Sequence, residues 1–299
     1  MTSGRTSPDD NPLAPGAWIA RPLRPRAWWR RQRWLVLRRS AQCALLGLFM
    51  LGPLAGVWWV KGNLAASHWF GLLPLNDPFI ALQSLLAVGT ITSTALIGAA
   101  LIAAFFWAVG GRAFCSWVCP VNIITDAAHW CREKLHLPPG WRPRPELRLW
   151  LLAMCLVVSA LTGALAWELV NPVTLVQRAL VFGIGLGWLV AIAIFGFDLL
   201  VSRRGWCGHL CPVGAFYGLI GASSPLRIAA DTREACSDCG DCFEVCPEPQ
   251  VITPALRGSG TRLVTSGDCT NCGRCIDVCP DDVFRFTERY GYERRREHA

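Results

Sequence analysis

Four long apolar stretches, each nearly free of charged side chains, dominate the first two thirds of the chain. They cover residues 41–60, 82–109, 149–167 and 179–201. As helices that rise about 1.5 Å per residue, stretches of this length cross a hydrocarbon core of about 30 Å. The composition agrees, since 53% of the residues are hydrophobic and only 17% are charged. The sequence therefore predicts an all-α membrane domain of four transmembrane helices over residues 34–225.

Basic residues alternate between the connections of these stretches. Nine Lys and Arg precede the first stretch, one follows it, six separate the second from the third, one follows the third, and twelve follow the fourth. Loops rich in Lys and Arg stay cytoplasmic. We therefore expect a multi-pass protein of the bacterial inner membrane with both termini in the cytoplasm. Residues 1–33, rich in proline and arginine, are expected to form a basic, disordered cytoplasmic arm.

The net charge of +8 does not by itself indicate a nucleic-acid partner. The basic residues occur in blocks that alternate with the apolar stretches, and no nucleic-acid-binding motif accompanies them. Membrane orientation explains the blocks more simply, so we expect no nucleic-acid partner.

Residues 226–299 contain two CxxCxxCxxxCP runs. In bacterial-type dicluster ferredoxins, three cysteines of each run hold one [4Fe-4S] cluster and the fourth reaches the other cluster. This pattern assigns one cluster to Cys236, Cys239, Cys242 and Cys279, and the second to Cys269, Cys272, Cys275 and Cys246. Zinc sites do not need two complete runs that each end in proline. The sequence therefore predicts a small α+β ferredoxin domain that holds two [4Fe-4S] clusters.

A second cysteine motif, CxxxCP, occurs once after the second apolar stretch and once after the fourth. The segments GRAFCSWVCPVNIIT and RGWCGHLCPVGAFYG share an aromatic residue before CxxxCPV, so the membrane domain is expected to consist of two similar halves. Both motifs are expected at the cytoplasmic face. Two interpretations stay open for Cys115, Cys119, Cys207 and Cys211: they jointly hold a further redox centre, or they are small buried residues at helix ends.

Polar residues near the opposite, periplasmic ends are candidates for a quinol pocket. Quinol oxidation needs groups that accept protons while electrons depart, and a carboxylate or imidazole at the membrane boundary suits this. The candidates are His68, Asp77, Glu168 and Asn171. Helix capping and interfacial anchoring explain the same residues equally well, so no catalytic residue is assigned.

Taken together, these segments resemble the NapH/MauN family of ferredoxin-type membrane proteins. The resemblance to NapH extends over nearly the whole chain after the arm, through WWRRQRWLVLRR, RAFCSWVCPVNIITD, ALTGALAWELVNPV, GWCGHLCPVGAFYG, CSDCGDCFEVCPEP and CTNCGRCIDVCPDDVF. It implies an electron-transfer subunit of a quinol dehydrogenase, not a stand-alone enzyme. It also implies menaquinol or ubiquinol as substrate, and as partners a periplasmic multi-cluster ferredoxin-type subunit and a periplasmic nitrate reductase module.

Two alternatives to this function remain. MauN-type subunits of methylamine utilisation share the CxxxCP pair and the ferredoxin tail. The other alternative is a membrane iron-sulfur redox sensor or assembly factor, although two closely coupled clusters favour conduction. The expected topology also poses a question: the ferredoxin domain is cytoplasmic while the reductase is periplasmic, so electrons have to cross the bilayer. A centre at the CxxxCP motifs is the candidate relay.

Overall fold

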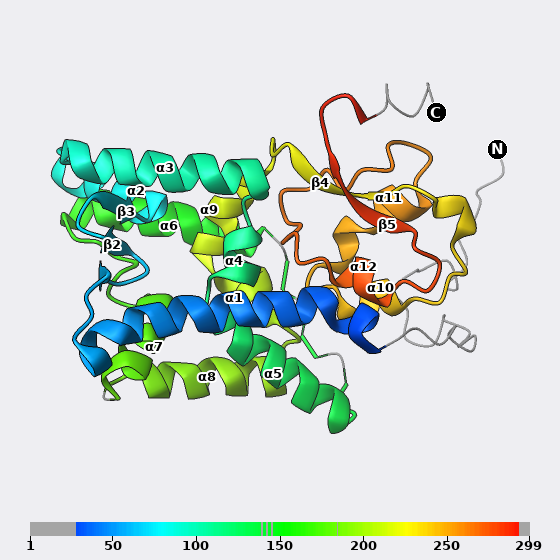
Figure 1. Ribbon diagram of the computed structural model, residues 1–299, viewed down its shortest axis with the longest axis horizontal. Helices are drawn as coiled ribbons and strands as arrows, with labels where there is room; N and C mark the ends of the chain where they lie inside the picture. The colour runs from blue at the N-terminus through cyan, green and yellow to red at the C-terminus, as the bar shows by residue number, and fades with distance from the viewer. Residues whose placement is uncertain (1–27, 139, 142, 145, 184, 293–299) are drawn as a thin grey trace.

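The computed structural model describes residues 28–138, 140–141, 143–144, 146–183 and 185–292. A body of long helices and a smaller ferredoxin-like body lie end to end along the long axis (Figure 1). Helix α1 (Trp28–Ala55) extends from the first body to the second. The predicted arm lies outside the described residues up to residue 27. Its last residues, 28–33, belong to α1, so the helix begins earlier than the apolar pattern indicates.

The helical body is built from two halves with the same order of elements. The first half consists of α1, a three-stranded antiparallel sheet of β1 (Val60–Gly62), β2 (Ala66–Trp69) and β3 (Leu73–Asn76), and then α2 (Pro78–Val88), α3 (Ser93–Val109), α4 (Ala113–Trp117) and α5 (Val121–Lys134). The second half consists of α6 (Leu147–Thr162), α7 (Pro172–Phe182), α8 (Gly187–Leu200), the π-helical turn η2 (Trp206–Leu210) and α9 (Pro212–Gly221). The CxxxCP motifs occupy matching places, in α4 and in η2.

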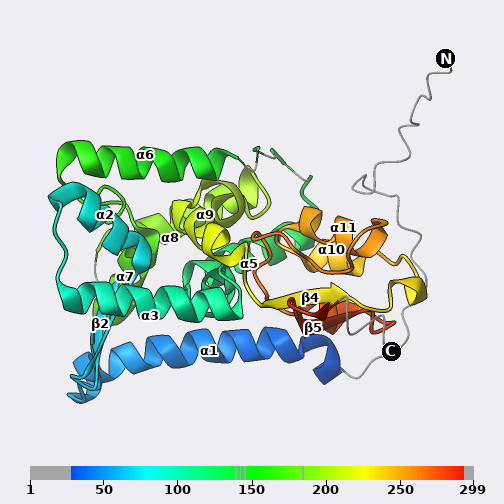
Figure 2. The same ribbon diagram turned by 90° about the horizontal axis from the view of Figure 1, so that it is seen from above.

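Helices of each half pack on helices of the other half. Helix α2 packs on α6 of the other half, and α7 packs on α1. In the same way α9 packs on α3, and α5 packs on α8. Each contact therefore has a counterpart under an exchange of halves, which gives the helical body an approximate twofold repeat. Figure 2 shows α1, α3 and α6 running along the length of this body.

Two of the four expected helices are each broken into two. The stretch at 82–109 forms α2 and α3, because Gly89 adopts a left-handed conformation (φ 73°) that ends α2 and Thr92 then caps α3. The stretch at 179–201 is divided between α7 and α8 in the same way, with Gly183 at φ 73°. The prediction of one continuous helix across each of these two stretches is therefore wrong. Apolar character alone does not reveal where a glycine turns the chain.

Among the described residues, one helix is long and apolar enough to cross a membrane, over Trp29–Ala55. The remaining apolar helices are shorter, with 10–17 residues each. Helices α3, α6 and α8 nevertheless expose large apolar side chains along their outer faces. These include Ile97, Leu101, Phe105, Trp150, Val157, Leu161, Leu189, Ile192 and Leu200. Such a surface is typical of contact with lipid or another apolar partner.

Helix α2 begins inside the helical body. Asp77 caps it by accepting a hydrogen bond from the backbone N of Phe79 at 2.9 Å. Gly98, about a third of the way along α3, has the preceding strand β3 against it: a Cβ atom there would lie 2.7 Å from the carbonyl oxygen of Pro74. The chain therefore enters the body through β3, and α2 runs back out to the loop before α3 (Figures 1 and 2).

The second body has the expected α+β character. Strands β4 (Leu226–Ala230) and β5 (Phe284–Glu288) pair antiparallel. Short helices α10 (Asp241–Val245), α11 (Thr253–Arg257) and α12 (Arg274–Val278) pack beside them, with 3-10 turns η3 (Arg233–Ala235) and η4 (Pro249–Val251) between. A small apolar core that includes Ile228, Phe243, Val264 and Val283 holds these elements together.

Candidate metal centre

The eight cysteines of the second body lie around two separate hollows. The lining of one hollow includes Cys236, Cys239, Cys242 and Cys279. The lining of the other includes Cys246, Cys269, Cys272 and Cys275. We call these the distal set and the proximal set, because the proximal set lies next to the helical body. Each set combines three cysteines of one run with the fourth cysteine of the other.

The two runs fold into matching turns. Gly240 (φ 81°) and Gly273 (φ 72°) take left-handed conformations directly before α10 and α12. Asp238 (φ 53°) and Asn271 (φ 45°) do so two residues earlier. Short polar side chains and glycine tolerate this region of backbone space best. The alternation turns the chain tightly around each hollow, so that three sulfurs of a run face the same space.

The donor set suits an iron-sulfur cube better than a single ion. Among the described residues, no group of three His, Cys, Asp or Glu side chains is arranged to hold one metal ion. Burial raises the pKa of Cys269 to about 11, so the Cys269 thiol would be protonated without a bound cation. Iron of a cluster held by these cysteines would supply that positive charge. The residues therefore fit the [4Fe-4S] group.

The four CxxxCP cysteines meet within the helical body. Cys119 is buried in one apolar cluster of the helical body, and Cys115, Cys207 and Cys211 pack against the same cluster. Burial raises the pKa of Cys211 to about 12, with Cys115 adding to the rise. The Sγ of Cys207 also lies 3.8 Å from the Oγ1 of Thr125. The repeat of α4 and η2 thus brings together two motifs that are 88 residues or more apart in the sequence.

The CxxxC loop of α4 contacts the proximal run directly. Ser116 Oγ donates to the carbonyl of Thr270 at 2.8 Å, and Trp117 Nε1 donates to the carbonyl of Asn271 at 3.2 Å. In return, Asn271 Nδ2 donates to the carbonyl of Val109, the last residue of α3, at 2.9 Å. Ser116, Thr270 and Asn271 are buried. Water is therefore excluded from the contact between the two cysteine-rich regions.

Buried ion pairs hold the same contact. Arg112, one residue before α4, lies 2.7 Å from Glu248, which follows Cys246 and Pro247. Arg148 of α6 lies 3.1 Å from the same carboxylate and also pairs with Asp268. The second guanidinium nitrogen of Arg112 donates to the carbonyl of Cys207 at 3.0 Å. One arginine therefore links a CxxxCP motif to the proximal set.

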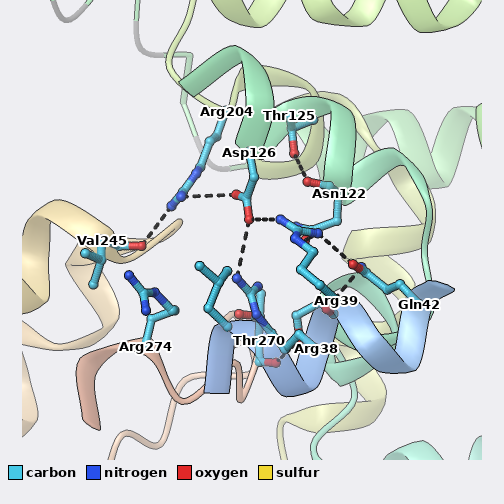
Figure 3. A network of polar contacts seen from close by, with 12 residues as sticks. Arg38, Arg39, Gln42, Asn122, Thr125, Asp126, Arg204, Val245, Thr270 and Arg274 are labelled. Carbon is cyan, nitrogen blue, oxygen red and sulfur yellow. Dashed lines mark hydrogen bonds and ion pairs between the residues drawn. The ribbon is translucent and has the colours of Figure 1, made fainter. Parts of the chain in front are cut away.

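A second charged cluster joins α1, α5 and the ferredoxin-like body (Figure 3). Asp126 pairs with Arg38 at 3.4 Å, with Arg39, and with Arg204 at 3.1 Å. Although burial opposes it, Arg204, Arg38 and Arg39 together hold the pKa of Asp126 below its usual range. Arg204 also donates to the carbonyl of Val245 at 3.0 Å. This cluster therefore ties α1 and α5 to the residue directly before Cys246 of the proximal set.

The start of α1 packs against the proximal run. The backbone N of Trp34 donates to the Asp277 carboxylate at 3.0 Å. The Trp34 indole covers Gly273, where a Cβ atom would lie 2.5 Å from its ring. The same ring meets Trp117 edge to face, with centroids 6.0 Å apart. Glycine is therefore required at position 273 both for its conformation and for the space that Trp34 fills.

The quinol candidates separate into two groups. Asn171 caps α7 and donates to Glu168 at 3.0 Å, and Glu168 acts electrostatically on the buried Asp77. The phenol of Tyr217, in α9, lies 3.4 Å from Asp77. His68, in contrast, is exposed on β2 opposite Pro74. Capping accounts for one role of Asp77 and Asn171, so the interpretation as caps is confirmed for these two residues.

Several residues of the site have no signal in the cysteine motifs. Tyr217, Arg112 and Trp34 are examples that the structure adds to the candidates. A longer sequence repeat, outside the cysteine motifs, marks the starts and ends of α2 and α7. It consists of an Asp or Asn before Pro, a Gln six residues later and a Gly twelve residues later. It occurs as Asp77, Pro78, Gln83 and Gly89, and again as Asn171, Pro172, Gln177 and Gly183. Both glutamines are buried.

Comparison with known proteins supports both bodies of the molecule. A family described as a 4Fe-4S binding domain matches residues 92–138 and again 180–227, and a 4Fe-4S dicluster domain matches residues 235–289. The methylamine utilization ferredoxin-type protein MauN of Methylorubrum extorquens is 58% identical over 260 residues, 87% of this chain and 91% of that protein. MauN of Paracoccus denitrificans is 55% identical over 264 residues, 88% of this chain and 93% of its own length.

The ferredoxin-type protein NapH of Escherichia coli is 49% identical over 269 residues, 90% of this chain and 94% of that protein. No solved structure matches the chain. The fold and the cysteine sites define a membrane-associated iron-sulfur protein that transfers electrons as a subunit. More particularly, the chain belongs to the NapH/MauN family of ferredoxin-type proteins.

Proposed function

We propose that this chain is the electron-transfer subunit of a quinol dehydrogenase and passes electrons from membrane quinol towards a periplasmic reductase. Two [4Fe-4S] clusters would be held by the distal and proximal sets, Cys236, Cys239, Cys242 and Cys279, and Cys246, Cys269, Cys272 and Cys275. The bound clusters would supply one-electron transfer. The chain's own residues hold the clusters, exclude water and fix the order of the sites.

The observation that carries this proposal is the buried contact between the CxxxC loop and the proximal run. Ser116, Trp117 and Arg112 reach the backbone of residues 268–271 with hydrogen bonds of 2.8, 3.2 and 3.1 Å. These bonds join residues between and beside the cysteines of the first CxxxCP motif to the backbone that carries Cys269. The order of sites that follows is CxxxCP motifs, proximal set, distal set.

The CxxxCP cysteines are proposed to hold a further redox centre between the membrane and the proximal set. Their four thiols converge, and the family described as a 4Fe-4S binding domain matches both segments that carry them. Burial among α3, α6, α4 and η2 shields this place from water. It therefore offers a relay on the path into the membrane, which the expected topology requires.

The helical body is proposed to span the inner membrane with α1, α3, α6 and α8. The outer faces of α3, α6 and α8 expose large apolar side chains, and the basic residues are concentrated at the end that carries the ferredoxin-like body. Reporter fusions after Gly205 should be active in the cytoplasm, and fusions after Gly183 in the periplasm. A periplasmic reporter at Ala299 would overturn this topology.

Proton acceptors for quinol oxidation are proposed at the inner end of α2. Asp77, Glu168 and Tyr217 lie together there, and carboxylates can take up protons while electrons leave. His68 stays a separate candidate on the exposed sheet. Asp77→Asn keeps the cap but removes a proton acceptor, so it should lower the rate of quinol oxidation while iron content stays unchanged. An unchanged rate would exclude Asp77 from the chemistry.

The partner system has two candidates. The NapH relatives suggest a periplasmic multi-cluster ferredoxin-type subunit and a nitrate reductase module, and the MauN relatives suggest methylamine oxidation. The identities to MauN, 58%, 55% and 48%, overlap with those to NapH, 49% and 46%, so both candidates fit. Purification from native membranes should decide, since either nitrate reductase components or methylamine-oxidising components would co-purify with the chain.

Iron analysis tests the clusters themselves. The distal and proximal sets should give about eight iron and eight acid-labile sulfide per chain after purification without oxygen. A Cys246→Ser variant should change the spectrum of the proximal cluster and leave the distal cluster intact, and Cys279→Ser should do the reverse. A total near four iron, or loss of the distal cluster alone in Cys246→Ser, would contradict the assignment.

A further inference from the structure

Arg227 is a fully buried arginine that has only carbonyl groups as hydrogen-bond partners. It lies on β4, directly after α9, and is 1% exposed. Its guanidinium donates to the carbonyls of Ser224 at 3.3 Å, Ala222 at 2.9 Å and Ser266 at 2.9 Å, and also to that of Gly221. No carboxylate of the described part of the chain forms an ion pair with it. Burying an unpaired charge is costly, so a compensating anion is expected nearby.

Other buried or partly buried arginines around the proximal set do have acidic partners. Arg112 and Arg148 share Glu248, and Arg204 pairs with Asp126. Of these arginines beside the proximal set, Arg227 is the one for which the described residues show no acidic partner; Arg132, in α5, is likewise buried with carbonyl partners. Its charge remains available to act on whatever anion occupies the neighbouring hollow.

The nearest candidate for that anion is the proximal set. Ile228, the next residue of β4, lines the hollow of the proximal set, and Asn271 Nδ2 donates to the carbonyl of Leu226, the residue before Arg227, at 3.1 Å. Ser266, which accepts from Arg227, is three residues before Cys269. Arg112 donates to the carbonyl of Asp268, next to Cys269, from the side of the helical body at 3.1 Å.

The distal set has a different electrostatic environment. The charged residues that line its hollow are Asp238, Asp281 and Arg257. Arg257 is already paired with Asp238 at 3.1 Å, and the Asp238 side chain is 68% exposed. Asp281 accepts from Ser237 at 2.6 Å beside Cys236. No buried, unpaired cation is seen beside this set in the described residues.

We propose that Arg227 is the internal counter-charge of the cluster held by Cys246, Cys269, Cys272 and Cys275, and that it selectively raises the reduction potential of this cluster. The inference rests on the proposed function, since it requires clusters in both sets. Each one-electron reduction adds one negative charge, and a positive charge in a dry, low-dielectric place stabilises the reduced form. Arg227 would thus make the proximal cluster a better electron acceptor. This effect offsets the lowering of the cluster's reduction potential by burial.

A purely structural role for Arg227 makes a different prediction. Its bonds to Gly221, Ala222 and Ser224 satisfy carbonyls at the end of α9, and its bond to Ser266 ties α9 to the ferredoxin-like body. Arginine at a helix C-terminus commonly does this. In that case substitution lowers the melting temperature but leaves both potentials where they are.

Redox titration of the whole protein, purified without oxygen and followed by electron paramagnetic resonance, separates the two roles. In Arg227→Gln the proximal potential should fall by about 59 mV or more, a tenfold change in the one-electron equilibrium constant, while the distal potential stays unchanged. Arg227→Lys keeps the charge and should retain most of the potential. Arg257→Gln is the matched control, in which an exposed and already paired arginine is removed, and it should shift the proximal potential by much less.

Each outcome can be interpreted even if Arg227→Gln is unstable, because Arg227→Lys tests the charge with most of the volume retained. The identity of the proximal signal is set beforehand by its change in Cys246→Ser. Equal potentials in wild type and Arg227→Gln would overturn the inference but leave the proposed function intact. A wild-type protein with only one cluster signal would instead contradict the proposed function.

Discussion

The ferredoxin-like body and the helical body bring cysteines together in different ways. In the ferredoxin-like body, two runs within 44 residues fold on themselves, and tight left-handed turns aim most of each ligand set from one segment. In the helical body, each CxxxCP motif supplies only two thiols. The set of four arises because two similar halves pack across each other.

This difference determines how each site should respond to change. A ligand set built locally depends on one small core, so a substitution there affects one cluster. A set built by a repeat depends on the packing of the whole helical body, and its loss should also cut the path between membrane and ferredoxin. The buried contact of Ser116 with Thr270 is where the two kinds of site meet.

The largest expected effect comes from the CxxxCP thiols. Cys115→Ser or Cys207→Ser should abolish quinol-linked electron delivery while the distal and proximal clusters stay intact, because a shared centre fails when one ligand is lost. The quadruple Ser variant should be no worse than either single one, since ligands of one centre are not additive. Reductase activity would be measured in membranes with quinol and, separately, with an artificial donor to the reductase.

Cys155→Ser is the matched control for this experiment. Cys155 lies on α6, outside both motifs, and is only partly buried. Replacing a packing cysteine by serine should cost about 1–3 kcal/mol and leave electron delivery near normal. Normal quinol-linked activity in both Cys115→Ser and Cys207→Ser would show that the CxxxCP motifs are structural turns, and the contrast between the two bodies would then disappear.

The sequence predicts the ferredoxin-like body well because its information is local. Spacing within each run gives the turns, and β4 begins at Leu226, the first residue of the predicted domain. The existence of two halves is likewise visible from the CxxxCP frames. In these regions the spacing of residues that are close in the sequence is enough to predict the structure.

The helical body is predicted less well because hydropathy does not register where a chain turns. Gly89 and Gly183 end α2 and α7 inside apolar stretches that otherwise appear continuous. The partners of Arg112 and Trp34 lie 136 and 243 residues away, and no spacing rule links them. Their positions follow from packing, which becomes visible only when both bodies are placed together.

An intermediate effect is expected from Arg112, which joins the two bodies. Arg112→Met leaves Arg148 as the ion-pair partner of Glu248 and removes a donor from the carbonyl of Cys207. Breaking a buried ion pair on one side costs roughly 3–5 kcal/mol. The control Arg257→Met removes an exposed pair with Asp238 and should cost about 1 kcal/mol or less. Denaturant unfolding followed by tryptophan fluorescence would measure both, and equal losses would show that the contact between the bodies is not stabilised by this pair.

The smallest effect tests the turn into the helical body that hydropathy does not reveal. A Cβ atom at Gly98 would lie 2.7 Å from the carbonyl oxygen of Pro74 and 3.1 Å from the backbone N of Asn76. These are backbone atoms of the segment that leads into Asp77, so they cannot rotate away as a flexible side chain would. Overpacking of this kind typically costs about 1–3 kcal/mol, while alanine in place of glycine within a helix returns up to about 1 kcal/mol.

Gly98→Ala should therefore destabilise the protein by a net 1–2 kcal/mol, roughly. Gly47→Ala in α1 is the matched control, since nothing lies within 4 Å of a Cβ atom there. The same substitution should then leave stability unchanged or raise it by up to about 1 kcal/mol. Strand β3 lies against Gly98 and leads directly into α2. Gly98→Ala should therefore also increase hydrogen exchange at the amides of residues 74–79, and Gly47→Ala should not. A Gly98→Ala variant as stable as Gly47→Ala, with unchanged exchange, would mean that β3 does not lie against α3 as described.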